Sequence, residues 1–159
     1  MDLIQQARTV LKGCAASTTG SHVLKIHDGS RNVLCAFARI DSLACEFYHL
    51  IVESAELVDA STQRLQDISE QLSRQLTYLL EPIAPIETDP EGCVIQMRSK
   101  PPQRSDDGAS YYELLIRRGG ELSLRRWKKT AKGERTVISS TVTHEVMLRL
   151  ISDLASAVG

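Results

Sequence analysis

Three stretches of the chain carry apolar residues at the three- and four-residue spacing of an amphipathic helix. Residues 2–15 form the first, with Asp2 as its N-cap. Residues 60–81 form the second, in which leucine and isoleucine recur on one face and Pro82 stops the helix. Residues 143–158 form the third, with a threonine as N-cap. These patterns predict three helices.

Between the helices, apolar and polar residues alternate as they do in half-buried strands. Residues 43–54 have the aromatic and β-branched content of a strand, although they also fit a helical stripe. We expect a third antiparallel strand here, and the alternative is one long helix over residues 42–81. Further strands are predicted at residues 22–27, 32–40, 93–98, 111–118, 121–129 and 135–139.

The clearest local signal is the basic hairpin over residues 111–129. Gly119-Gly120 supplies the positive φ values of a two-residue turn, and such a turn fixes the register of the strands. Each face of the hairpin then carries an apolar pair, so either Leu115 with Leu124 or Tyr112 with Trp127 can lie on the buried face. The predicted partners are Leu115 with Leu124, Glu113 with Arg126, and Tyr112 with Trp127.

The elements follow one another in the order α-β-β-β-α-β-β-β-β-α. Strands in antiparallel series closed by helices predict a single α+β domain over residues 1–159, with antiparallel sheet and the helices packed on one face. The Pro- and Asp-rich segment 99–110 is predicted to be a mobile loop. In element order alone, the chain is similar to small secretion-chaperone-like α+β domains. That resemblance implies a homodimer that holds a partner polypeptide on its sheet, although such chaperones tend to be more acidic.

Composition places the chain among ordinary globular proteins, with 42% hydrophobic and 25% charged residues in 159. The longest aliphatic run is far too short to span a membrane, and the N-terminus lacks the pattern of a signal peptide. We therefore expect a cytoplasmic protein. The four cysteines, which form no C-x-x-C pair, are expected to be free and buried: Cys14, Cys35, Cys45 and Cys93.

Catalytic and cofactor motifs are absent from the sequence, including the P-loop, the dinucleotide fingerprint and the zinc-protease signature. Cys45 and His49 share one side of the predicted strand, but at about 13 Å apart they are too distant to share a metal. We predict no catalytic residue, no cofactor and no metal site.

Charge is unevenly distributed, although the net charge is only −1. Residues 53–91 contain nine acidic residues against two basic ones, and residues 98–135 contain eleven basic residues against five acidic ones. The dense part of the basic segment is a candidate surface for a partner or an anion. Its residues are Arg117, Arg118, Arg125, Arg126, Trp127, Lys128 and Lys129.

These observations support three hypotheses. The first is a non-enzymatic protein-interaction or adaptor and chaperone-like domain, homodimeric, which uses a sheet face or the basic hairpin. The second is a nucleic-acid or anion binder centred on the basic hairpin. The third is an enzyme of unknown type, which would require an enclosed pocket where Cys, His or carboxylates converge.

Overall fold

The computed structural model describes residues 2–15 and 21–159, and within these ranges it contains three α-helices and a ten-stranded antiparallel sheet. The helices are α1 (Leu3–Ala15), α2 (Thr62–Gln75) and α3 (His144–Ala157), with a short 3-10 turn η1 (Ala55–Leu57). The strands are β1 (His22–Asp28), β2 (Arg31–Ile40), β3 (Ala44–Ser54), β4 (Ile83–Asp89), β5 (Val94–Ser99), β6 (Gln103–Ser105), β7 (Gly108–Arg117), β8 (Glu121–Thr130), β9 (Arg135–Ile138) and β10 (Ser140–Thr143). The predicted α+β class and the predicted order of elements are confirmed.

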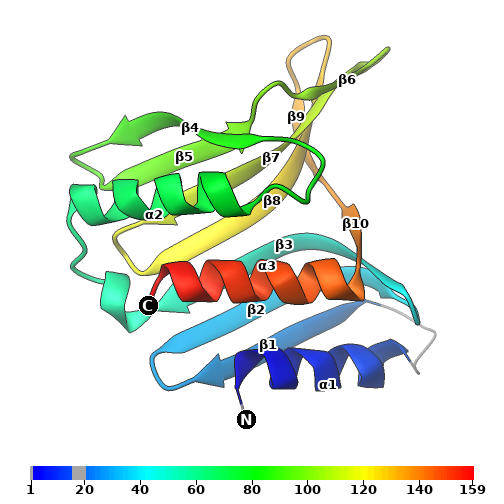
Figure 1. Ribbon diagram of the computed structural model, residues 1–159. Coiled ribbons are helices and arrows are strands. Elements are labelled where there is room, and N and C mark those ends of the chain that lie inside the picture. The colour runs from blue at the N-terminus through cyan, green and yellow to red at the C-terminus, as the bar shows by residue number, and fades with distance from the viewer. Residues whose placement is uncertain (1, 16–20) are drawn as a thin grey trace.

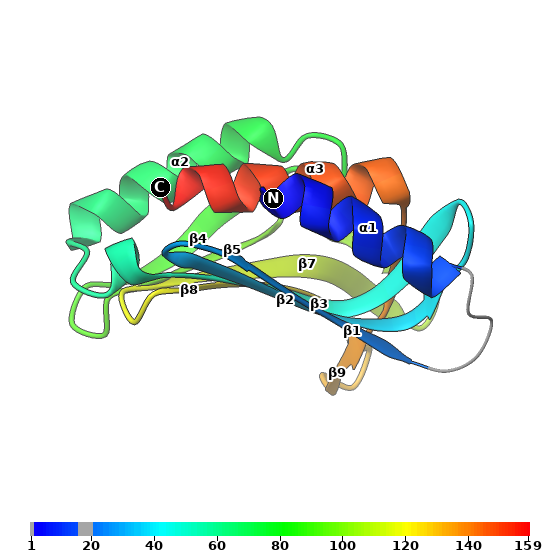
Figure 2. The same ribbon diagram turned by 90° about the horizontal axis from the view of Figure 1, so that it is seen from below.

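All three helices lie on one face of the sheet, as predicted, and the opposite face is uncovered (Figures 1 and 2). The main path of the sheet runs β1-β2-β3-β8-β7-β5-β4. Helix α3 crosses the middle of the sheet between α1 and α2 and contacts both (Figure 1). A single apolar core fills the space between the helices and the sheet. None of the helices in the described part of the chain reaches the length and apolarity that crossing a bilayer requires.

The sheet forks in its centre. At one end β3 pairs with β8 through five residue pairs, from His49–Arg125 to Glu53–Glu121. Beyond them, β3 pairs with β10 and β8 pairs with β9 instead. Strand β9 therefore runs into the fork beside β8, the chain turns at Ser139, and β10 runs out of the fork beside β3. This insertion divides the sheet into two half-sheets that diverge from a common junction.

Each α-helix begins at a capping side chain, and those of α1 and α3 are the predicted ones. The Asp2 carboxylate accepts a hydrogen bond from the Gln5 backbone N–H at 2.8 Å. Ser61 caps α2, and the Thr143 hydroxyl accepts from the Val146 N–H at 3.1 Å. These bonds satisfy backbone donors that a helix leaves free at its first turn.

The predicted helix over residues 60–81 is too long, because α2 ends at Gln75. Residues 76–82 form an irregular segment in which Leu76 and Leu79 are still buried and Leu80 has a φ of 65°. Apolar spacing indicates which side chains are buried, and Leu76 and Leu79 are buried here although the backbone is not helical. Pro82 therefore follows the end of the helix by several residues and does not cause it.

The predicted register of the basic hairpin is wrong by one residue. The structure pairs Tyr111 with Trp127, Tyr112 with Arg126, and Leu114 with Leu124. The turn spans three residues rather than two, and Gly120, with a φ of 103°, is the glycine that needs the left-handed region. The extra turn residue changes which side chains share a face. As a result, Tyr112 lies on the helix side and Tyr111 beside Trp127 on the uncovered side.

The strand predicted over residues 43–54 is confirmed as β3, which spans Ala44–Ser54, so the alternative of one long helix over 42–81 is wrong. The segment 99–110 is not a plain loop, since β6 pairs with the start of β7 there. Whether that hairpin is mobile stays a prediction.

Candidate functional site

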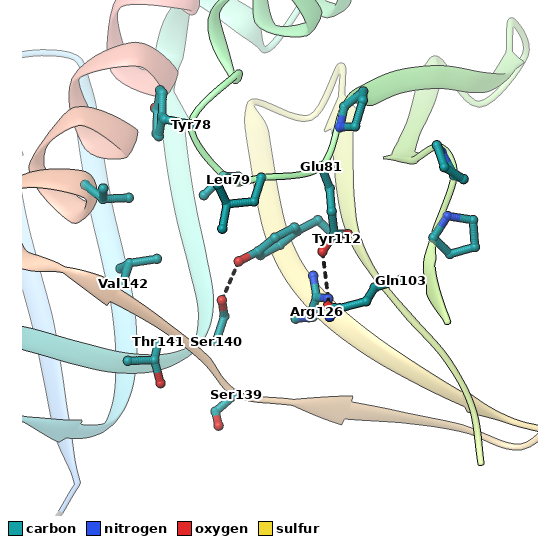
Figure 3. A pocket seen from close by; sticks show the side chains of 15 residues that line it. Tyr78, Leu79, Glu81, Gln103, Tyr112, Arg126, Ser139, Ser140, Thr141 and Val142 are labelled. Carbon is teal, nitrogen blue, oxygen red and sulfur yellow. Dashed lines mark hydrogen bonds and ion pairs between the residues drawn. The ribbon is translucent and has the colours of Figure 1, made fainter. Parts of the chain in front are cut away.

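A pocket of about 710 Å³ lies in the fork, on the helix side of the sheet (Figure 3). The irregular segment after α2 forms one wall, and Ser139–Val142 form the opposite wall. Prolines from two loops and apolar side chains line much of it, namely Leu79, Leu80, Pro82, Pro101, Pro102, Val142 and Val146. Pockets of about 300–1,000 Å³ with apolar walls and a few polar groups are typical of ligand sites.

The polar part of this pocket is built around Arg126, whose side chain is 9% exposed. Its Nη2 donates to Glu81 Oε2 at 2.8 Å, to Gln103 Oε1 at 3.0 Å and to Ser110 Oγ at 3.0 Å. The guanidinium group also lies 4.5 Å from the centre of the Tyr112 ring. The alternation of β8 turns this one arginine inward and its neighbours outward.

Both members of the Arg126–Glu81 ion pair have a polar atom without a hydrogen-bond partner among the described residues. These atoms are Arg126 Nη1 and Glu81 Oε1, and both are buried. Buried polar atoms are almost always hydrogen-bonded, and each unpaired one costs about 1–3 kcal/mol. The pair therefore leaves one donor and one acceptor unsatisfied, in side chains that line the pocket.

Hydrogen bonds hold both walls of the pocket. The Tyr112 hydroxyl is hydrogen-bonded to Ser140 Oγ, which ties β7 to β10 across the fork (Figure 3). The Tyr78 hydroxyl donates to Asp153 Oδ2 at 2.7 Å. Burial, with the bond to Asp153 second, raises the pKa of Tyr78 far above its ordinary value, so this phenol stays protonated.

The uncovered face of the sheet carries a second buried charge, Glu113, whose side chain is 8% exposed. Its carboxylate accepts from Gln96 Nε2 at 2.8 Å, from Trp127 Nε1 at 3.1 Å and from Arg135 at 3.2 Å. Both carboxylate oxygens are thus hydrogen-bonded. Arg135 reaches this site from β9, which lies on the uncovered side of the sheet (Figure 2).

Guanidinium groups cover the aromatic rings beside Glu113. Arg135 lies 4.2 Å from the centre of the Trp127 ring, and Arg98 lies 5.1 Å from the centre of the Tyr111 ring. Tyr111 is itself buried. A nucleic-acid base could stack on these rings only by displacing an arginine, which weakens one argument for the nucleic-acid hypothesis.

The seven candidate residues of the basic hairpin do not form one surface. Along β8, strand alternation places Arg126 and Lys128 on the helix side, and Arg125, Trp127 and Lys129 on the uncovered side. The predicted cross-strand pair of Glu113 with Arg126 is wrong, because these two charges lie on opposite faces. Lys128 instead forms an ion pair with an aspartate of the β6–β7 turn.

Arg117 and Arg118 lie at the hairpin turn, about 26 Å from Lys129 by the strand rise of ~3.3 Å per residue. Arg118 Nε donates to the Ala60 carbonyl at 2.8 Å, and Arg117 is paired in register with Glu121. Basic and acidic residues therefore mix at this end of the sheet. The opposite end, toward β6 and β9, keeps the excess of basic residues.

Sequence reasoning missed the residues that contact Arg126 and Glu113. Glu81 lies 45 positions before Arg126, in a segment predicted to be helix. Gln103 lies in the segment predicted to be a loop, and Tyr112 was assigned to the opposite face by the register error. A correct three-residue turn would have placed Tyr112 beside Arg126, but no local signal indicates Glu81.

The cysteines and histidines do not assemble into a site within the described residues. All four cysteines are free, as predicted, although Cys14 is only half-buried. Burial first, and Asp41 second, raise the pKa of Cys45 to about 12, which makes it a poor nucleophile. A bulge in β3 turns His49 to the face opposite Cys45, contrary to the prediction that they share a side. In the described ranges, no three His, Cys, Asp or Glu side chains are grouped to hold a metal ion.

Comparison with known proteins adds no family to this description. No protein-family model, curated protein or solved structure matches the chain.

Proposed function

We propose that this chain is a non-enzymatic protein-interaction domain that binds an extended polypeptide segment in the pocket of the fork. The observation that carries the proposal is the pair of unsatisfied atoms, Arg126 Nη1 and Glu81 Oε1. One is a donor and the other an acceptor, and they belong to the same ion pair. A backbone amide offers the complementary carbonyl and N–H groups.

The walls of the pocket suit the side chain of such a segment. Pro82, Pro101 and Pro102 offer apolar surface without N–H donors, and Val142 and Val146 close the far side. The ion pair neutralises itself, so the pocket favours a neutral polar group over a charged one. An aliphatic residue flanked by its own amides has the required chemistry.

Access to the two atoms requires a movement of the pocket wall, since both atoms are buried. Leu80, in the segment 76–82, is 95% exposed and has a φ of 65°, in the left-handed region that costs a leucine about 1–3 kcal/mol. Strained non-glycine residues of this kind cluster at ligand clamps. A strained, exposed rim is the part of the pocket expected to move on binding.

A fragment titration tests the proposal. N-acetyl-leucine methylamide, added at millimolar concentration to ¹⁵N-labelled protein, is expected to shift the backbone NMR signals of residues 78–82 and 139–142. The corresponding methyl ester lacks the C-terminal N–H and is expected to bind at least about threefold more weakly, because the Glu81 oxygen then stays unpaired.

A matched pair of variants controls the titration. Val142→Trp fills the pocket and is expected to abolish the shifts, whereas Val137→Trp, on the exposed strand β9, is expected to leave them unchanged. Shifts that persist in Val142→Trp would contradict the pocket as the site. Equal affinity for amide and ester would contradict the role of the Arg126–Glu81 pair.

A second candidate function, anion binding, is favoured by a groove of about 780 Å³ at the basic end of the sheet. Arg98, Lys100, Arg104 and Lys129 line it against a single carboxylate, Asp106. Within the described residues, none of the four cations has an ion-pair partner. An excess of unpaired cations in a concave surface raises the local concentration of anions.

Fluorescence anisotropy of a labelled single-stranded oligonucleotide tests this second function. Binding at ~50 mM salt is expected to fall as salt rises, and Arg104→Glu is expected to weaken it about tenfold or more. Arg74→Glu, an exposed cation of α2, is the matched control. Absence of binding at ~50 mM salt would remove this function, since electrostatic affinity is greatest there.

A further inference from the structure

Three parallel rows of side chains cross the uncovered face of the sheet. The strand registers place the residues of each row side by side on successive strands. On the three central strands β3, β8 and β7, the side chains of the central row are apolar or neutral, and those of the two outer rows are ionisable. From β2 to β5, the central row is Leu34, Ile51, Ser123, Leu115 and Gln96; one outer row is Ala36, His49, Arg125, Glu113 and Arg98; the other is Asn32, Glu53, Glu121, Arg117 and Val94.

On each of the three central strands, one outer row has an acidic side chain where the other has a basic side chain or a histidine. On β8, Arg125 lies two residues to one side of the central row and Glu121 lies two residues to the other side. On β3, His49 and Glu53 are placed in the same way. Arg125, Glu121 and Glu53 have no ion-pair partner among the described residues, and Arg125 and Glu121 are half-buried.

We infer that this face binds a second copy of the chain, face to face, about a two-fold axis that runs along the central row. Rotation about that axis brings each outer row over the opposite row of the other copy. Arg125 then faces the partner copy's acidic position 121, and His49 faces its acidic position 53. Leu34, Ile51 and Leu115 pack on their own symmetry mates, as an isologous interface requires.

The charge pattern selects this axis over the other in-plane two-fold axis. An axis parallel to the strands keeps each row over itself. With the axis between β3 and β8, it would set Arg125 on the partner copy's position 49 and Glu121 on its acidic position 53. Like charges facing each other across a dry interface cost several kcal/mol, so that arrangement is disfavoured.

The size and the ends of the face also suit a second copy. Strands ~4.8 Å apart give the seven strands of the main path a width of about 30 Å, and about eight residues at ~3.3 Å give a length of about 26 Å. The resulting ~800 Å² is what one partner contributes to a standard interface. The same rotation brings the basic β9 end of one copy toward the end of the other that carries Glu53 and Glu121.

A charge-swap experiment tests the inference by sedimentation velocity at ~1–100 μM protein. The wild-type chain is expected to sediment as a dimer. Arg125→Glu alone and Glu121→Arg alone each set like charges against each other twice, and each is expected to weaken dimerisation about tenfold or more. An equal mixture of the two variants is expected to dimerise again, because every facing pair is then of opposite sign.

Matched controls lie on the helix side of the molecule. Arg74→Glu and Glu70→Arg, both exposed on α2, are expected to dimerise as the wild type does. Circular dichroism establishes that each variant is folded, and Arg125→Gln and Glu121→Gln form a milder second pair that removes a charge without reversing it. A wild-type monomer at ~100 μM, or folded single variants whose mixture stays monomeric, would overturn the inference. The amide titration of the pocket on the helix side is a separate measurement, so failure of this inference is distinguishable from failure of the proposed function.

Discussion

Glu113 and Arg126 are both buried charges near the middle of the same hairpin, and they differ in how completely their hydrogen-bonding groups are used. Glu113, on the uncovered face, has donors on both oxygens. Arg126, on the helix face, has three acceptors on Nη2, whereas its Nη1 and the Oε1 of its partner Glu81 have no hydrogen-bond partner in the part of the chain that the structure describes. A saturated buried charge stabilises one arrangement of the chain. An unsaturated one, beside a pocket, indicates a place for a ligand.

The largest expected effect comes from removing the saturated charge. Glu113→Ala leaves Trp127 Nε1, Gln96 and Arg135 without their acceptor, and is expected to lower the free energy of unfolding by about 3–4 kcal/mol. Urea denaturation measures the change, with the exposed Glu134→Ala as control, for which less than about 0.5 kcal/mol is expected. A small effect at Glu113 would mean that its three contacts contribute little.

Arg126 is expected to behave differently when its partner is removed with it. Arg126→Met alone leaves Glu81 as an unpaired buried carboxylate and is expected to cost about 3 kcal/mol. The double variant with Glu81→Leu removes both charges and is expected to cost less than about 1.5 kcal/mol, yet to abolish amide binding in the pocket. Additive costs in a double-mutant cycle would contradict the coupling of these two residues.

The strained rim of the pocket offers an effect of opposite sign. Leu80→Asn is expected to raise the free energy of unfolding by about 1 kcal/mol, because asparagine tolerates the left-handed region better than leucine. Leu43→Asn, at another exposed leucine without a positive φ, is the control and is expected to have no stabilising effect. If Leu80→Asn stabilises the protein and also weakens amide binding, Leu80 belongs to the part of the pocket rim that moves on binding.

The smallest effect concerns His49, on the uncovered face. Burial first, and the nearby Arg125 second, hold the pKa of His49 below its ordinary value of 6.5. The unfolded chain therefore binds this proton at a higher pH than the folded chain does. Stability is fully present above about pH 6.5 and is lost as pH falls through the folded pKa.

Urea denaturation of the dilute protein at pH 7.5 and 5.5 measures that dependence. His49→Gln is expected to lose less stability than the wild type over this interval. Parallel losses in the two proteins would show that other groups account for the pH dependence.

The sequence contained enough information for the layers of the fold but not for its pairing details. Capping residues such as Asp2 and Thr143 mark the ends of helices through local bonds, which a sequence displays directly. The end of α2 and the hairpin turn depend on tertiary contacts. Leu76 and Leu79 are buried without a helix, and Gly120 lies where an added side chain would come within 2.9 Å of the Ser54 carbonyl.

The candidate site was less predictable than the fold for the same reason. Glu81, Gln103 and Tyr112 meet Arg126 only because the fork brings three separate loops and strands together. The adjacent basic residues of the hairpin predict one charged surface, whereas strand alternation places Arg125 and Arg126 on opposite faces. Clustering in the sequence of a strand predicts a charged segment, and only the register says which side each charge occupies.

The fork in the sheet has a mechanical consequence. The two half-sheets share five residue pairs at one end and are held apart elsewhere by the folded strip from β9 to β10. A rotation about these five β3–β8 pairs would change the width of the pocket without breaking any strand pair inside either half. The same five pairs lie at the centre of the proposed dimer contact on the other face. If both proposals hold, self-association would fix the angle between the halves, and occupancy of the pocket and assembly of two copies would be thermodynamically linked.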